Sequence, residues 1–292
     1  MKKLGFIGAG NMGEALIRGL LEKKVFKATE IIAADPEPKR RQKLARTLGI
    51  ETTTKNPEVI VNAPAIVVAV KPQIIDTVLE DAKRALEQTS QAQAGRSVSA
   101  RSSAKSKPKA GRLFISIAAG ITLNHLEGQL GSLARVVRVM PNAPAMVGRG
   151  MAAVVRGARA STADEALTLK IFGAVGEAVA IKDEAALDGV TALSGSGPAY
   201  VYLFAKALAD AAASEGIEPR LALKMTLQTL LGAVAMMRES GLGPDELIRM
   251  VASPGGTTEA ALSAFSQQGF TTVVAGAVRA AAARSRELGR IR

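Results

Sequence analysis

One short segment near the start of the chain constrains the fold more than any other. Gly8, Gly10 and Gly13 form a G-x-G-x-x-G motif, with an apolar run directly before it and an amphipathic pattern directly after it. This context is typical of the first strand, turn and helix of a dinucleotide-binding fold. The turn needs glycine because bare backbone must approach a pyrophosphate, and the helix N-terminus adds partial positive charge there. A looser match over residues 148–153 lacks that context.

An acidic residue follows the motif at the spacing that a dinucleotide fold predicts. Asp35 ends a second apolar run 22 residues after Gly13, where about 20 is expected. A carboxylate there can accept both ribose hydroxyls of NAD and would repel the 2′-phosphate of NADP. The cations that follow, Lys39, Arg40 and Arg41, could instead neutralise such a phosphate or form an exposed helix face. The choice between NADH and NADPH stays open on these residues.

Apolar runs alternate with helical periodicity over the first half of the chain. We expect strands near residues 3–8, 30–35, 65–70, 113–117 and 135–139, and helices over 12–23, 36–48 and 72–87. This alternation predicts an α/β fold with a Rossmann-type, doubly wound parallel sheet. Between about residues 88 and 110 the periodicity gives way to Gln, Ser, Ala, Lys and Arg, which predicts a flexible basic insertion on the surface.

The pattern changes after residue 157. We expect a helix over 161–172, a short strand over 177–181, and then almost only helices, separated by Gly, Pro and Ser. The helical stretch around 221–237 is too apolar to have one covered face only. We therefore predict a dinucleotide-binding domain over 1–157 and an all-helical substrate and dimerisation domain over 158–292.

Composition excludes several classes of site. The chain has no Cys and a single His, His125, which removes thiolate zinc sites, cysteine nucleophiles and two-His metal motifs, so we expect no metal. The net charge is +12, but six of those charges lie between Gln88 and Arg112 with no acid among them. The remainder is unremarkable, and we predict no nucleic-acid partner. No uncharged stretch approaches the ~18 residues of a membrane span, and the lack of Cys suits a reducing cytoplasm.

Several strings, taken in order along the chain, resemble the pyrroline-5-carboxylate reductase family. Those from the first domain are GFIGAGNM at 5–12, AVKP at 69–72, SIAAG at 116–120 and MPNAP at 140–144. LSGSGPAY at 193–200 and SPGGTT at 253–258 are the specific ones, since related hydroxyacid dehydrogenases share the first domain only. The resemblance implies reduction of 1-pyrroline-5-carboxylate to L-proline by hydride transfer from NADPH or NADH. It also implies a homodimer, or a ring of dimers.

The resemblance assigns roles to individual residues. For cofactor binding it indicates Gly8, Ala9, Gly10, Asn11, Met12, Asn56, Ala69, Val70, Lys71, Pro72 and Asn142, to which the spacing argument adds Asp35. For substrate binding it indicates Ser253, Gly256, Thr257 and Thr258.

The residues of the SPGGTT loop fit this role on physical grounds. Gly255 and Gly256 before a helix are expected to leave free N–H groups that can hold a carboxylate. The hydroxyl of Thr258, the expected catalytic residue, could hydrogen-bond the ring nitrogen that gains a proton.

Two other functions stay open at the level of sequence. The first is a related reductase of another imine or of a 3-hydroxyacid. A hydroxyacid enzyme should place a lysine base on the first long helix of the second domain, where Lys206 stands. The alternative from another class is a non-catalytic dinucleotide-binding redox sensor. The complete SPGGTT loop argues against a sensor, which needs no carboxylate site.

Overall fold

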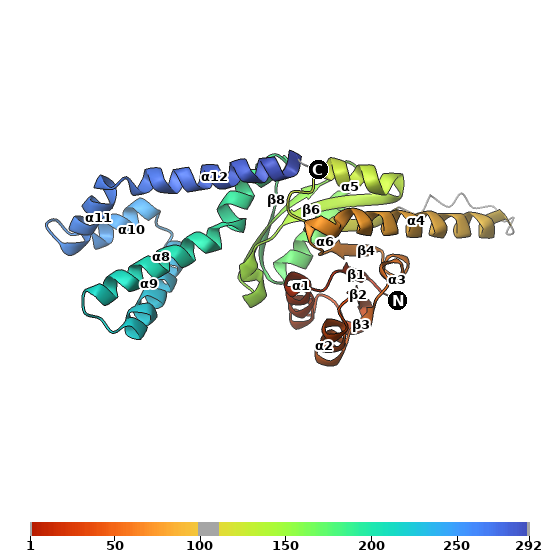
Figure 1. Cartoon of the computed structure of the whole chain (residues 1–292), viewed down its shortest axis with the longest axis horizontal. Helices are drawn as coiled ribbons and strands as arrows, with labels where there is room; N and C mark the ends of the chain where they lie inside the picture. Colours follow the sequence, from red (N-terminus) through yellow and green to blue (C-terminus); the bar gives the residue numbers. More distant parts are fainter. Residues whose placement is uncertain (1, 99–110, 291–292) are drawn as a thin grey trace. The chain divides into compact units, whose positions relative to one another are not determined.

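The computed structural model describes residues 2–98 and 111–290 (Figure 1). The chain divides into two compact units, one of residues 1–195 with 282–292 and one of residues 196–281. The boundary expected at residue 157 therefore falls inside the first unit. The reason is β8 (Gly176–Ala180), which pairs with β7 (Gly150–Arg156) and so belongs to the sheet of the first unit.

The first unit alternates strands and helices as expected. Its strands are β1 (Leu4–Ile7), β2 (Ile31–Ala34), β3 (Glu51–Thr53), β4 (Ala65–Val68), β5 (Arg112–Ser116), β6 (Ala134–Met140), β7 and β8. Its α-helices are α1 (Asn11–Glu22), α2 (Pro38–Leu48), α3 (Asn56–Asn62), α4 (Ile75–Val98), α5 (Leu123–Leu130), α6 (Thr162–Gly173) and α7 (Ala186–Val190). Short 3₁₀ turns are η1 (Ala28–Glu30), η2 (Pro72–Ile74), η3 (Gly131–Leu133) and η4 (Ala143–Val147), and η5 (Thr191–Gly195) is a π-helical turn.

The strands of the described chain form one eight-stranded sheet in the order β3-β2-β1-β4-β5-β6-β7-β8. The first six follow the order of the Rossmann fold, which confirms the predicted class. One pairing departs from the expected parallel pattern, because β6 and β7 are antiparallel. Only η4 and a few flanking residues join them, which is too short for the crossover that a parallel pair needs. β3 and β7 were not expected from the sequence, since β3 has three residues and β7 begins at a glycine.

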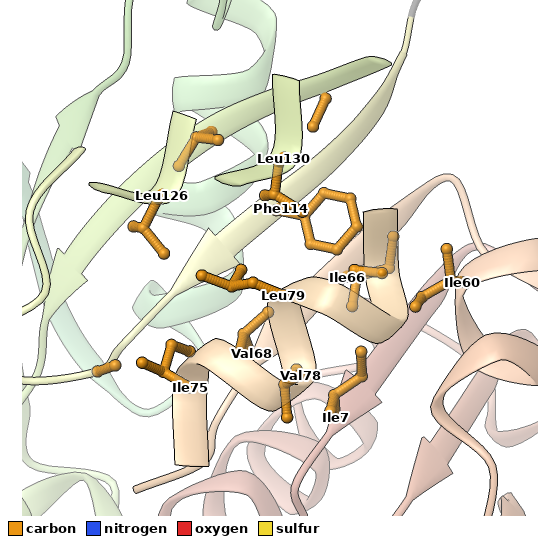
Figure 2. Close-up of a cluster of buried hydrophobic side chains, with 14 of the residues drawn as sticks. Ile7, Ile60, Ile66, Val68, Ile75, Val78, Leu79, Phe114, Leu126 and Leu130 are labelled. Atoms are coloured by element: carbon orange, nitrogen blue, oxygen red, sulfur yellow. The ribbon is translucent and has the colours of Figure 1, made fainter. Parts of the chain in front are cut away.

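Helices cover both faces of this sheet. On one face, side chains of α3, α4 and α5 pack against the strands, as Figure 2 shows for Ile60, Leu79 and Leu126 around Phe114. On the other face, α1, α2 and α6 bury side chains such as Leu16, Leu44 and Phe172 against β1 and its neighbours. β1, β2 and β4 are buried along their whole length, as a strand covered on both sides requires.

The helix α4 is longer than expected. It continues to Val98, so the first part of the predicted loop, residues 88–98, is helical. Gln and Ala have high helix propensity, and helix formation does not require the apolar side chains whose loss suggested a loop. The rest of the predicted insertion, residues 99–110, lies outside the described residues.

The second unit is helical throughout. It contains α8 (Gly197–Ser214), α9 (Pro219–Glu239), α10 (Pro244–Val251), α11 (Thr257–Gln267) and most of α12 (Phe270–Arg290). α8 and α9 pack side by side (Figure 1). α9 leaves many large apolar side chains exposed, namely Leu221, Leu223, Met225, Leu227, Leu231, Val234, Met236 and Met237. Exposed apolar side chains in such number are typical of a protein interface. Among the described residues, no helix is long and apolar enough to cross a membrane.

Candidate functional site

Each glycine of the N-terminal motif has its own structural role. Gly8 has a φ of +85°, and a Cβ there would lie 2.6 Å from the carbonyl oxygen of Ala69. A Cβ on Gly13 would lie 2.7 Å from the carbonyl oxygen of Gly8. Gly10 differs, because a Cβ there would meet no atom of the described chain within 4 Å. Gly8 and Gly13 therefore shape the turn, whereas Gly10 keeps open the space that a bound group would fill.

The turn lies where a Rossmann sheet binds its ligand. β1 and β4 are neighbours, while the chain leads from β1 to β2 on the other side, so the strand order reverses here. The carboxyl end of β1 brings Gly8 to Gly10, and that of β4 brings Ala69 and Val70, with Lys71 exposed beside them at the start of η2. No side chain caps the N-terminus of α1, so its first N–H groups face this space. These features fit a dinucleotide pyrophosphate.

Asp35, which its spacing places at the cofactor, has hydrogen-bond partners within the chain. Its carboxylate is buried and already engaged: Oδ2 accepts the N–H of Ala9 at 2.8 Å, and Oδ1 accepts the N–H of Glu37 at 2.9 Å. Nη1 of Arg40 lies 2.9 and 3.0 Å from the two oxygens. Asp35 thus holds the glycine-rich turn.

A second acidic residue joins the helices that flank the turn. Glu14, in the first turn of α1, binds Lys43 of α2 at 2.7 Å and also Arg18. The hydrogen bond from Lys43 lowers the pKa of the Glu14 carboxyl, against the opposing effect of its burial. The pair fixes α2, which carries Arg40 and Arg41, relative to the turn.

Two asparagines expected at the cofactor site have structural partners. Asn56 begins α3 and donates to Asp81 of α4 at 3.3 Å. Asn142 follows β6, accepts the N–H of Met151 at 2.8 Å and donates to the carbonyl of Ser194 at 3.0 Å. Both follow carboxyl ends of strands, at the same edge of the sheet as Gly8.

The SPGGTT loop connects α10 and α11 in the second unit. Gly255 has a φ of +71°, and its N–H donates to the carboxylate of Glu259 at 2.7 Å. The N–H of Gly256 donates to the carbonyl of Ser253 at 3.0 Å. The N–H groups of these two glycines are therefore not free, contrary to expectation. No side chain caps α11, so the N–H groups open to a ligand are those of Thr257 and Thr258 at its start.

Residues for metal binding or for a lysine base are not arranged for such roles in the described chain. In the described part of the chain, no three His, Asp or Glu side chains gather closely enough to hold a metal ion. His125 pairs with Asp76 at 2.6 Å. Lys206, the base that a hydroxyacid enzyme would need, forms an exposed ion pair with Asp210 one turn along α8, as expected for a solvated position.

Comparison with characterised proteins decides the family. The chain is 40% identical over 286 residues to the pyrroline-5-carboxylate reductase of Pseudomonas aeruginosa, covering 98% of this chain and 96% of that protein. The chain belongs to the pyrroline-5-carboxylate reductase family. The family model described as pyrroline-5-carboxylate reductase dimerisation matches residues 184–288. A model described as NADP oxidoreductase, coenzyme F420-dependent, matches residues 3–91.

Solved structures of the reductase family agree over nearly the whole chain. The enzyme of Coxiella burnetii has a TM-score of 0.86 at 31% identity, with 98% of each chain covered. The pyrroline carboxylate reductase of Plasmodium falciparum, solved with NADP bound, has a TM-score of 0.81 at 32% identity and covers 99% of this chain and 98% of its own.

Three features of these sites had no signal in the sequence. The bond between Asn142 and Ser194 spans 52 positions. The contact of Glu259 with Gly255 depends on the backbone path of the loop. The hydroxyl of Ser194 is buried with no hydrogen-bond partner among the described residues, which marks the π-helical turn as a place where a ligand atom could bind.

Proposed function

We propose that this chain reduces 1-pyrroline-5-carboxylate to L-proline, with NADPH or NADH as hydride donor. The observation that carries the proposal is the start of α11, where the N–H groups of Thr257 and Thr258 are free and lie beside the Thr258 hydroxyl. The preceding N–H of Gly255 already binds a carboxylate, that of Glu259. Named reductases of this substrate share the family and nearly the full length of the chain.

The cofactor half of the proposal rests on the first unit. The pyrophosphate would lie against Gly8, Ala9 and Gly10 and the N-terminus of α1, where Asn11 and Met12 begin the helix. The remaining proposed contacts follow the other strands at the same edge, namely Asn56, Ala69, Val70, Lys71, Pro72 and Asn142. The bound dinucleotide supplies the hydride, and the chain supplies binding and alignment.

The substrate half rests on the second unit. The carboxylate of the cyclic imine would accept hydrogen bonds from the N–H groups of Thr257 and Thr258, at the positive end of α11. Ser253 and Gly256 pack closely and fix the loop, since the Ser253 hydroxyl lies only 2.4 Å from the position that a Cβ of Gly256 would take. The Thr258 hydroxyl would hydrogen-bond the imine nitrogen, which gains a proton as the adjacent carbon gains hydride. A protonated imine is electrophilic, so this chemistry needs no histidine.

The chain is a homo-oligomer, as the dimerisation region of its family indicates. We propose that the exposed apolar side chains of α9 form the dimer interface, that dimers assemble into a larger ring, and that the enzyme acts in the cytoplasm.

A comparison of three substrates, each offered separately, tests the proposed reaction. Purified protein with NADPH or NADH is offered 1-pyrroline-5-carboxylate, an acyclic imine and a 3-ketoacid (the oxidised form of a 3-hydroxyacid), and cofactor oxidation is followed at 340 nm. We expect turnover of the cyclic imino acid only, with L-proline identified by chromatography. Preferential turnover of the 3-ketoacid would contradict the proposal, as would cofactor binding without turnover of any substrate.

A further inference from the structure

The carboxylate at the end of β2 is buried among donors that belong to the chain itself. Only 3% of Asp35 is exposed, and its oxygens are shared by the N–H of Ala9, the N–H of Glu37 and Nη1 of Arg40. A carboxylate that selects NAD accepts a hydrogen bond from the ribose 2′-hydroxyl. Here one oxygen holds the turn that receives the pyrophosphate, so Asp35 acts on the cofactor through Ala9.

The charge of Asp35 is also compensated within the chain. Nη1 of Arg40 contacts both carboxylate oxygens, while the Arg40 side chain stays 41% exposed at the rim. The ordinary reason for which an acid at this position rejects a 2′-phosphate is repulsion between two negative charges. A guanidinium placed on the carboxylate removes most of that repulsion.

Further positive charge surrounds the pair. Nη1 of Arg41 donates to the backbone carbonyls of Asp35 and Pro36. Because these two acceptors are uncharged, neither bond neutralises the charge of Arg41. From residue 35 to residue 46 the chain carries five cations and two acids, a net charge of +3. Lys43 is paired with Glu14, so the segment together with this partner carries +2, with Lys39, Arg41 and Arg46 set against Glu37.

We propose that Asp35 and Arg40 are a pair of positioning residues that make the ribose end of the site accept a 2′-phosphate. The chain then binds adenine dinucleotides that carry this phosphate at least as tightly as those that lack it. Asp35 holds the glycine-rich turn, Arg40 cancels its charge, and Arg41 with Lys39 attracts the phosphate. The inference rests on the proposed placement of the cofactor at Gly8 to Gly13.

Adenosine fragments test the inference without any turnover. Adenosine 2′,5′-bisphosphate and AMP are titrated calorimetrically into the full chain and into Arg40→Gln. We expect the wild type to bind the bisphosphate at least as tightly as AMP. In Arg40→Gln the uncompensated Asp35 should weaken bisphosphate binding about tenfold or more, while AMP binding changes less than threefold. A purely structural role for Arg40 would weaken both fragments equally, and that result would overturn the inference.

Two further variants separate charge from contact. Asp35→Asn combined with Arg40→Gln removes both charges, and we expect it to restore bisphosphate binding to within about threefold of the wild type. Failure of this rescue, in a double variant that still binds AMP, would contradict the neutralising role of Arg40. Arg46→Gln is the matched control, since it removes the same charge from the same helix six positions farther on. It should leave the ratio of bisphosphate affinity to AMP affinity unchanged. If neither fragment binds the wild type, the cofactor placement itself is wrong, whatever reaction the enzyme catalyses.

Discussion

The side-chain amide of Asn142 bridges two segments that are distant in sequence: it donates to the carbonyl of Ser194 at 3.0 Å and accepts the N–H of Met151 at 2.8 Å. One side chain thus joins the end of β6 to the start of β7 and to the π-helical turn η5. The residue proposed to contact the cofactor is therefore itself fixed by two backbone groups. Its position depends on packing inside the first unit.

Asn142→Ala should destabilise the fold as well as weaken cofactor binding. The substitution leaves the Met151 N–H and the Ser194 carbonyl without their partner, and each lost bond of this kind costs about 0.5–1.5 kcal/mol. We expect a loss of about 1–3 kcal/mol in the free energy of unfolding, measured by denaturant titration. Asn62→Ala is the control, because the exposed Asn62 bonds only the carbonyl of Glu58, one turn earlier in α3. Equal losses in both variants would contradict the bridging role.

The glycines of the turn should separate folding from binding. Gly13→Ala forces a Cβ to within 2.7 Å of the Gly8 carbonyl, so it should lower the melting temperature of the protein without cofactor. Gly10→Ala meets no atom within 4 Å, so its melting temperature should stay close to that of the wild type. The added methyl would instead occupy the space proposed for the pyrophosphate, and NADPH affinity should fall about tenfold or more. Wild-type affinity in Gly10→Ala would refute this placement.

Asp164 should make stability depend on pH in the acid range. Burial alone would raise the pKa of its carboxyl, but hydrogen bonds from Arg135 and Ser161 outweigh burial and hold the pKa below the ordinary value of 3.8. A lowered pKa in the folded state stabilises the fold above pH 3.8, and this stabilisation is lost as the pH falls through the folded-state value.

We therefore expect Asp164→Asn to lower the free energy of unfolding at pH 7 by about 1–3 kcal/mol, measured by denaturant titration. The difference from the wild type should shrink below pH 3.8, where the carboxyl of the unfolded wild type takes up a proton before that of the folded protein does. A difference that stays constant down to pH 3 would show that the charge of Asp164 is not responsible.

The apolar surface of α9 should control assembly. Leu231 is 65% exposed in the single chain, and Leu231→Glu would place a charge in the proposed interface. We expect the mass measured by light scattering after size exclusion to fall towards that of a monomer. Arg46→Glu, at an exposed position of α2 in the first unit, should leave the mass unchanged. An unchanged mass in Leu231→Glu would move the interface away from this surface.

The features that could be predicted from the sequence are those that depend on local patterns. The glycine motif, the apolar strands and the SPGGTT string each carry their signal within a few residues. The sheet order β3-β2-β1-β4-β5-β6 follows from them, because βαβ units have few alternative topologies.

The features that sequence reasoning missed depend on contacts between distant residues. Asp35 has the spacing of a ribose acceptor, yet only the fold shows that Ala9 and Arg40 occupy its oxygens. Gly255 and Gly256 look like free donors until the loop path brings Glu259 and Ser253 against them. The antiparallel β7 begins in a glycine-rich segment, whose composition conceals a strand.

The central claim is that the Thr258 hydroxyl assists reduction of a cyclic imino acid. Steady-state oxidation of NADPH and NADH with 1-pyrroline-5-carboxylate, compared between the wild type and Thr258→Ala, tests it most directly. We predict turnover by the wild type and a loss of kcat/KM on the order of tenfold or more in the variant, ~1.4 kcal/mol of barrier. Cofactor affinity should stay unchanged, since Thr258 lies outside the dinucleotide-binding unit. Wild-type kinetics in Thr258→Ala would contradict the account.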